Sequence, residues 1–192
     1  MCSSDLVGVK NPEQTVKALL LYAETYHQDR FQVVETEISG FVLIGADEQG
    51  NQKKVFFRLD TVGLGERGYF ILEHKTSKWN KDLWRASHRF STQVGVGNHL
   101  LYCLYGDTPE GVDCLRLNGI FLQSPLKTKE RPAAEFLRVP MRMSAKAMES
   151  WLFETNEHYD NIQHDIMRLE KAKEGDDVLR CFRRNQDGCV QF

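Results

Sequence analysis

The sequence has none of the features that mark membrane proteins, secreted proteins or nucleotide-driven motors. No apolar run approaches the roughly eighteen residues of a membrane span, and the N-terminus has no basic-then-apolar signal pattern. The five cysteines are odd in number and scattered, so they do not suggest a disulfide framework. A phosphate-binding loop of the G-x4-GK[ST] type is also absent. We therefore expect a cytoplasmic protein that has no membrane contact and no ATPase motor of its own.

A strong positive charge is missing as well. The net charge of −2 and the pI near 6.3 argue against a generally basic nucleic-acid coat, although a local basic surface would be enough for an enzyme that acts on nucleic acid. The composition is ordinary for a globular chain, with 41% hydrophobic and 27% charged residues. At 192 residues, the chain is long enough for one domain with a substantial core.

The chain is organised around the stretch from Val55 to Lys75, VFFRLDTVGLGERGYFILEHK. This stretch predicts two strands joined by a short glycine-rich turn, with Asp60 at the end of the first strand and Glu73 and Lys75 on the second. Because side chains alternate along a strand, Glu73 and Lys75 share one face and His74 points away. Two acids and a lysine thus converge. Carboxylates bind hard divalent cations, and a neighbouring ammonium group can orient water and offset charge on a phosphate.

An acid followed after twelve intervening residues by acid-x-lysine resembles the PD-(D/E)XK nuclease superfamily. The sequence from Glu73 to Thr76, EHKT, is similar to the second motif of its RecB-like branch of phage and CRISPR-associated exonucleases, and Leu59 stands where the superfamily usually has proline. The resemblance implies an α/β (α+β) fold with a restriction-endonuclease-like core, in which helices flank a central mixed sheet that contains an antiparallel meander. It also implies that Asp60, Glu73 and the backbone carbonyl of His74 hold Mg²⁺ or Mn²⁺, with Lys75 as the catalytic lysine.

The resemblance points to two further site residues. RecB-like nucleases carry a glutamine on the helix after the lysine strand, and Gln93 matches it; the tyrosine that usually follows is replaced by Gly97. These nucleases often carry a glutamate in the first strand, which makes Glu35 a weak accessory metal ligand. The alternatives are an exposed helical glutamine and a solvated strand glutamate. We expect His27 to be a surface residue and not the metal-ligating histidine of the family.

Cations and aromatic residues interleave after Lys75. We expect Lys78, Arg85 and Arg89 to contact DNA, since lysine and arginine neutralise phosphates. Trp84 could stack on bases, but its helical spacing favours packing inside the protein. A later basic loop could also touch phosphate, although a solvated charge run is the simpler interpretation; it contains Lys127, Lys129 and Arg131.

Periodicity and turn residues predict the remaining elements. Helices are expected at residues 12–28, 81–104 and 144–173, with a bend near the glycines of the second. Strands are expected on both sides of a turn at residues 47–51, then at residues 114–126 and 136–143, where Pro140 indicates an edge strand. The apolar stripes of the first and last helices comprise Val16, Leu19, Leu20 and Ala23, and Met148, Trp151, Leu152, Ile162, Ile166 and Leu169.

We expect three segments. Residues 1–11 are a disordered or non-native N-terminus, residues 12–180 are the nuclease-like domain, and residues 181–192 are a tail that could be a shortened cysteine-containing segment. Related proteins have a cluster of cysteines in that region, of which Cys189 would be the first here. Because an iron–sulfur cluster needs four thiolates, none is expected in this chain.

The function that the resemblance implies is a metal-dependent DNA nuclease encoded by a bacterium or phage. It would act as an exonuclease in recombination, repair or phage replication, with DNA and a helicase or recombination protein as partners. One alternative is a nuclease-fold module that binds DNA or protein without cutting, and the intact pair of acids with its lysine argues against it. A soluble α/β enzyme with no link to nucleic acid has no motif in its favour.

Overall fold

The computed structural model describes residues 12–77, 80–88, 91–123 and 132–172, and this part of the chain divides into two compact units. The core unit contains the described residues up to Val42 and those from Val55 to Met148. The hairpin–helix unit contains Leu43–Lys54 and the described residues from Glu149 onward. None of the helices in the described ranges combines the length and the apolar character that crossing a membrane requires.

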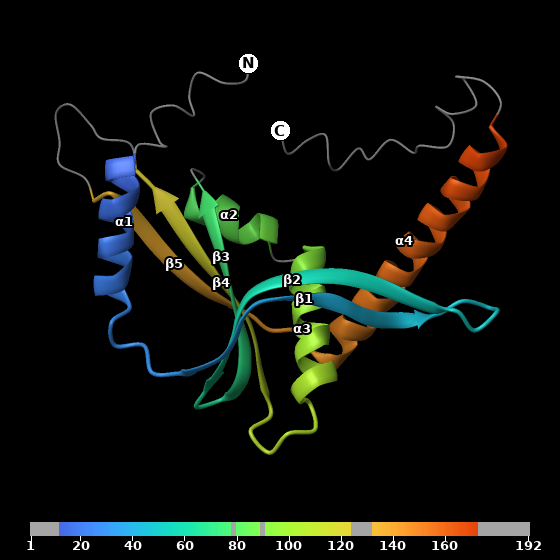
Figure 1. Cartoon of the computed structure of the whole chain (residues 1–192), viewed down its shortest axis with the longest axis horizontal. Coiled ribbons are helices and arrows are strands. Elements are labelled where there is room, and N and C mark those ends of the chain that lie inside the picture. The colour runs from blue at the N-terminus through green and yellow to red at the C-terminus, as the bar shows by residue number, and fades with distance from the viewer. Residues whose placement is uncertain (1–11, 78–79, 89–90, 124–131, 173–192) are drawn as a thin grey trace. The chain divides into compact units, whose positions relative to one another are not determined.

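In the described residues, a helix is followed by three strands, two helices, two strands and a last helix (Figure 1). Within the described residues, five strands form one sheet in the order β1-β2-β3-β4-β5. The pair β2 and β3 is antiparallel, β3 and β4 are parallel, and β4 and β5 are antiparallel. The elements are α1 (Pro12–Thr25), β1 (Gln32–Ala46), β2 (Gln52–Gly65), β3 (Gly68–Ser77), α2 (Lys81–His88), α3 (Thr92–Tyr105), β4 (Val112–Leu122), β5 (Ala134–Met141) and α4 (Ala145–Lys171). The expected α+β fold, a mixed sheet with a meander flanked by helices, is confirmed.

Two tight turns produce the meander. Between β1 and β2, the carboxylate of Asp47 accepts the backbone N–H of Asn51 at 2.7 Å, at the turn that the sequence predicts. Between β2 and β3 the chain turns within two residues and enters β3 at Gly68, whose φ is 105°. A Cβ on Gly68 would lie 2.4 Å from the carbonyl oxygen of Gly111, so both the conformation and the space require glycine there.

The single helix expected at residues 81–104 is wrong, because the structure has two helices, α2 and α3. Helix α2 ends at His88, and α3 begins after Ser91, whose hydroxyl accepts the N–H of Val94 at 3.4 Å and caps α3. The glycines at which a bend was expected lie inside α3. A Cβ on Gly97 would be 2.3 Å from Cδ1 of Leu115, so this glycine lets α3 approach β4 closely.

Helix α1 buries a different face from the predicted one. Ala18 is buried, and Tyr22 packs edge-on against Phe136 of β5 with ring centroids 5.3 Å apart. The polar contacts of the Tyr22 hydroxyl, described below, select this face over the aliphatic one. The predicted core stripe is therefore wrong: its larger members, Val16, Leu19 and Leu20, are 55–67% exposed.

The packing predictions for Trp84 and Pro140 hold, whereas the apolar stripe predicted for α4 has no buried residue within the described helix. Trp84 of α2 is 2% exposed and lies edge-on to Phe121 of β4, which confirms its packing role. Strand β5, which contains Pro140, is at the edge of the sheet as predicted. Helix α4 begins just after Ser144, whose hydroxyl accepts the N–H of Ala147 at 3.2 Å.

Two polar contacts join the hairpin to α4 in the hairpin–helix unit. The amine of Lys53 donates to the carboxylate of Asp160 at 2.7 Å, and Nδ2 of Asn156 donates to the carbonyl oxygen of Ile44 at 2.7 Å. Helix α4 has no buried residue in its described length.

Candidate active site

The site lies where β2 and β3 separate. Their antiparallel pairing ends at Thr61 and Leu72. Beyond that point Oδ2 of Asp60 accepts the backbone N–H of His74 at 2.7 Å, and Oε2 of Glu73 accepts the backbone N–H of Asp60 at 3.4 Å. The two carboxylates thus take up N–H groups that the β2–β3 ladder no longer pairs, and the separation of the strands brings both acids to one place.

Glu73 is the centre of the cluster. Its Oε1 accepts from Nζ of Lys75 at 2.9 Å and from Nε2 of Gln93 at 2.6 Å. Glu73 is 4% exposed, whereas the side chains of Asp60 and Lys75 are 33% and 30% exposed. A buried carboxylate needs such donors, because burying an unpaired charge is costly. In this cluster Glu73 is therefore the buried acid, whereas the carboxylate of Asp60 and the amine of Lys75 reach solvent.

Helix α3 fixes Gln93 over Glu73. The capping serine sets the start of α3, and Gln93 lies in its first turn. From there α3 packs against β3. A Cβ on Gly97 would lie 3.5 Å from Ile71, and the rings of Tyr105 and Tyr69 stack with their centroids 4.0 Å apart. The structure thus brings Gln93 to the acids because α3 packs closely on β3 and β4.

Glu35 does not join this cluster. The hydroxyl of Tyr105 donates to Oε1 of Glu35 at 3.5 Å, a long contact. Tyr105 lies at the opposite end of α3 from Gln93, about 18 Å along the helix axis at 1.5 Å per residue. Burial and the carboxylate of Glu35 raise the pKa of Tyr105. The structure thus places Glu35, predicted as an accessory ligand, outside the acid cluster, as an exposed glutamate of β1.

A second polar group lies on the other face of the sheet. His74, Asn118 and Arg138 are register partners on β3, β4 and β5. The hydroxyl of Tyr22, from α1, accepts from Nδ2 of Asn118 at 2.7 Å and from Nη2 of Arg138 at 3.3 Å, and lies 3.1 Å from Nε2 of His74. A hydroxyl oxygen has two acceptor lone pairs, and both are used. With both lone pairs used, the hydroxyl proton is left to donate to Nε2 of His74.

The hydrogen bonds of the Tyr22 hydroxyl favour one tautomer of His74. If Nε2 accepts, Nδ1 carries the proton, and Nδ1 lies 3.5 Å from Oδ2 of Asp60. At that separation the interaction is electrostatic and orienting and is not a well-formed hydrogen bond. The Asp60 carboxylate thus has the His74 ring beside it as well as the backbone N–H that it accepts. Sequence reasoning assigned to His74 only its backbone carbonyl.

The residues behind His74 were missed from the sequence. Arg138 also donates to Asp29 at 2.6 Å. Burial would lower the pKa of Arg138, but the contacts with Asp29 and Tyr22 together outweigh burial and raise the pKa. Asn118 is 0% exposed and lies in the second half of β4, where its neighbours from Leu117 to Leu122 are apolar or glycine. A buried amide of this kind needs hydrogen-bond partners, and that was the signal in the sequence that could have indicated a polar layer.

The donor set fits a hard divalent cation. Asp60 and Glu73 provide carboxylate oxygens, and the backbone carbonyl of His74 is part of the same strand segment. No group of three or more His, Cys, Asp or Glu side chains suited to a metal is found among the described residues. A metal at this site would thus be held by two carboxylates, a carbonyl and water, a combination that suits Mg²⁺, which keeps several of its waters.

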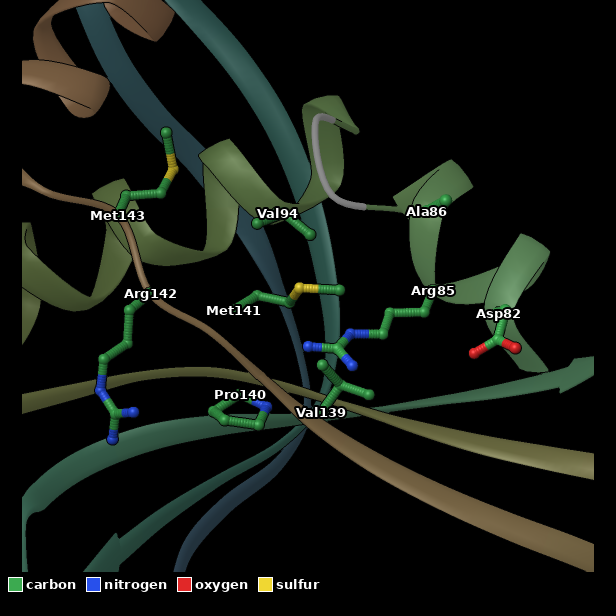
Figure 2. A pocket seen from close by; sticks show the side chains of 9 residues that line it. All are labelled: Asp82, Arg85, Ala86, Val94, Val139, Pro140, Met141, Arg142 and Met143. Atoms are coloured by element: carbon green, nitrogen blue, oxygen red, sulfur yellow. The ribbon is translucent and has the colours of Figure 1, made fainter.

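The structure describes only some of the residues that we expect to contact DNA. Arg85 is exposed on α2 and lines a cavity next to β5 (Figure 2). Lys78, Arg89 and the basic loop from Lys127 to Arg131 lie outside the described residues. His27 is on the surface, as expected, with Nδ1 within 2.7 Å of the carbonyl oxygen of Glu24.

No protein-family model matches this chain, and no curated protein matches it significantly. One solved structure that matches is described as "Crystal structure of SSO0001", with a TM-score of 0.37 and 14% sequence identity. The match covers 77% of this chain and 61% of that chain, so this chain spans less than two thirds of the length of its structural neighbour. A likeness at this TM-score carries no argument about function, which rests on the site itself.

Proposed function

We propose that this chain is a metal-dependent DNA nuclease of the PD-(D/E)XK type, acting as an exonuclease in recombination, repair or phage replication. The observation that carries the proposal is the pair of contacts on one buried carboxylate: Lys75 and Gln93 both donate to Oε1 of Glu73, next to Asp60. The order of elements supports it, since a helix and an antiparallel meander precede two helices and a parallel strand.

Each residue has a role that follows from its position. Asp60, Glu73 and the carbonyl of His74 would hold Mg²⁺ or Mn²⁺, which when bound polarises a phosphate and lowers the pKa of water. Lys75 orients the attacking water and offsets charge that develops on phosphate. Gln93 holds Glu73 in place and steadies water or a phosphate oxygen. The Nδ1–H of His74 orients the carboxylate of Asp60.

The proposal includes the setting of the reaction. DNA is the substrate, in the cytoplasm of a bacterium or a phage-infected cell. Because the sequence contains no phosphate-binding loop of the motor type, a helicase or recombination protein would supply any DNA unwinding.

Cleavage assays with the whole chain test this function. Linear and circular single- and double-stranded DNA would be incubated with Mg²⁺, Mn²⁺ or EDTA. We expect degradation that EDTA abolishes and that Lys75→Ala reduces by at least about 100-fold. Lys146→Ala, which removes an exposed lysine at the start of α4, is the matched control and should cleave normally.

Two results would overturn the proposal. Tight DNA binding without cleavage in any metal would identify a binding module with a nuclease-like fold. Cleavage that Lys75→Ala leaves intact would mean that the reaction takes place elsewhere or comes from a contaminating enzyme.

A further inference from the structure

A cavity of about 660 Å³ lies between α2, the start of α3 and the end of β5. Its lining is mostly apolar along β5, and Figure 2 shows the side chains of Val139 and Met141 beside the end of Arg85. The volume is in the range of pockets that hold small organic ligands. The full lining is Asp82, Arg85, Ala86, Val94, Val139, Pro140, Met141, Arg142 and Met143.

Arg85 gives the cavity a positive charge, and in the part of the chain that the structure describes no ion pair compensates it. Among the described residues no acid lies within ion-pair distance of Arg85, including Asp82 on the same helix. Figure 2 shows its guanidinium extending toward β5, whereas the carboxylate of Asp82 points another way. Arg142 differs, because it is bound to the buried carboxylate of Asp113. A planar guanidinium with unused donors suits a phosphate.

The cavity is on the same face of the sheet as the acid cluster. Glu73 is the register partner of Leu117, and Leu117 is the partner of Val139, so the three form one row across β3, β4 and β5. Two strand spacings separate Glu73 from Val139, about 10 Å. The first turn of α3 lies between them: Gln93 contacts Glu73, and the next residue, Val94, lines the cavity.

We propose that this cavity is a subsite for one nucleotide of a single DNA strand, with a backbone phosphate on Arg85 and the base against the apolar surface of β5. The inference rests on the proposed function and adds the position of the strand. From the cavity, the strand passes the first turn of α3 and reaches the acids.

Charge and shape select this ligand. A phosphodiester carries a single negative charge, which matches one free guanidinium, whereas the acid Asp82 at the cavity disfavours a ligand as highly charged as a free nucleoside triphosphate. The base-facing surface offers Met141, Met143 and Pro140 but few groups that could read a base edge. Methionine adapts to different shapes, so we expect binding with little sequence preference.

The test measures binding of fluorescent oligothymidylate by anisotropy, in the Lys75→Ala background with EDTA so that no cleavage occurs. Arg85→Ala should weaken binding by about 10-fold and lower the salt slope of log K by about 0.7, the value for one phosphate contact on a single strand. Ala86→Phe, which fills the cavity from α2, should weaken binding similarly. Arg67→Ala, which removes an exposed arginine from the β2–β3 turn, is the matched control and should change binding less than twofold.

A second comparison tests the base. An oligonucleotide with abasic sites should bind the parent protein more weakly than oligothymidylate, and Ala86→Phe should remove that difference. Binding that both cavity variants leave unchanged, or that Arg67→Ala weakens equally, overturns the subsite. Thermal melting identifies a variant that fails to fold, and the other cavity variant then decides.

The outcomes separate the two proposals. Metal-dependent cleavage with normal binding by both cavity variants would retain the nuclease and reject the subsite. Binding that depends on Arg85, with no cleavage by the wild-type chain in any metal, would retain the subsite and reject the nuclease. Absence of any binding to single-stranded DNA would overturn the subsite.

Discussion

The core unit and the hairpin–helix unit use polar contacts in opposite ways. In the core unit, apolar side chains such as Phe70, Ile71 and Leu115 are 0% exposed, and the polar groups are held inside this packed frame. In the hairpin–helix unit, α4 has no buried residue, and contacts such as that of Lys53 with Asp160 hold the helix. Packing positions a polar site in the first unit, whereas polar contacts do much of the positioning in the second.

This difference predicts different stabilities. Burial of apolar surface supplies most of the free energy of folding, so segments with little burial open locally at low cost. The stripe of α4 that the sequence predicts is apolar but open to solvent: Ile162 is 46% exposed, Ile166 43% and Leu169 37%. We therefore expect substitutions in the core unit to affect global unfolding and those in α4 to affect only local opening.

Among substitutions of polar side chains, the largest loss of stability is expected for Asp113→Ala in the core unit. The side chain of Asp113 is 4% exposed and binds both Arg116 and Arg142. Removing the shared acid of a buried network costs about 3 kcal/mol. Urea denaturation at pH 7 measures this loss, with Glu110→Ala, an exposed acid nearby, as a control that should stay within about 0.5 kcal/mol.

The same variant has a predicted pH dependence. Burial would raise the pKa of Asp113, but hydrogen bonds from Arg116 and Arg142 outweigh burial and lower it. A carboxyl whose pKa is lowered by folding stabilises the protein above its unfolded pKa of about 3.9, and that stabilisation is lost as the pH falls through the folded pKa. The difference between wild type and Asp113→Ala should thus shrink below about pH 4. A difference that is constant down to pH 2 would contradict this assignment.

Tyr22→Phe should have the next largest effect. Without the hydroxyl, the buried amide of Asn118 and the partly buried ring of His74 lose a hydrogen-bond partner, which costs about 2 kcal/mol. Tyr102→Phe, on an exposed tyrosine of α3, is the control and should be neutral. Nitrogen NMR shifts of His74 provide a direct measurement: wild type should show the Nδ1–H tautomer, and the variant should lose this preference. An Nε2–H tautomer in the wild type would mean that the Tyr22 hydroxyl does not donate to His74.

The two layers of the site were not equally predictable. Asp60, Glu73 and Lys75 follow from short-range rules, since a tight turn joins their strands and alternation places two of them on one face. The layer of His74, Asn118 and Arg138 depends on the register of three strands, which only the folded sheet fixes. Local sequence patterns thus indicate alternation along a strand and tight turns, but they do not show which residues of distant strands become register partners.

The helices show the same limit. The buried face of α1 was predicted from its aliphatic residues, but the contacts of Tyr22 with partners far along the chain decide it. Helix α3 starts at a capping serine, Ser91, inside a stretch whose length favoured a single helix. Gln93 was found through resemblance, and the cavity near Arg85 could not be found, since it forms only where α2 meets β5.

A smaller effect is expected for Asp160→Ala in the hairpin–helix unit. It leaves the amine of Lys53, a residue 6% exposed, without its carboxylate, but Asp160 itself is half exposed, so the cost should be about 1 kcal/mol. Hydrogen exchange should speed up in α4 and the tip of the hairpin and stay unchanged in β3 and β4. Glu157→Gln, an exposed acid on the same helix, is the control. Faster exchange throughout the sheet would mean that the two units unfold together.

The smallest effect is expected for Ile162→Ala in α4. This variant is informative when it is compared with Ile71→Ala in β3. The two changes remove the same atoms from side chains that are 46% and 0% exposed. Ile71→Ala should cost about 2–5 kcal/mol because it leaves a cavity in a packed core, whereas Ile162→Ala should change stability by less than about 0.5 kcal/mol. Denaturant midpoints of the two variants measure this contrast. A loss above 1 kcal/mol for Ile162→Ala would mean that the apolar stripe of α4 is covered in solution, and α4 would then be stabilised by burial like the helices of the core unit.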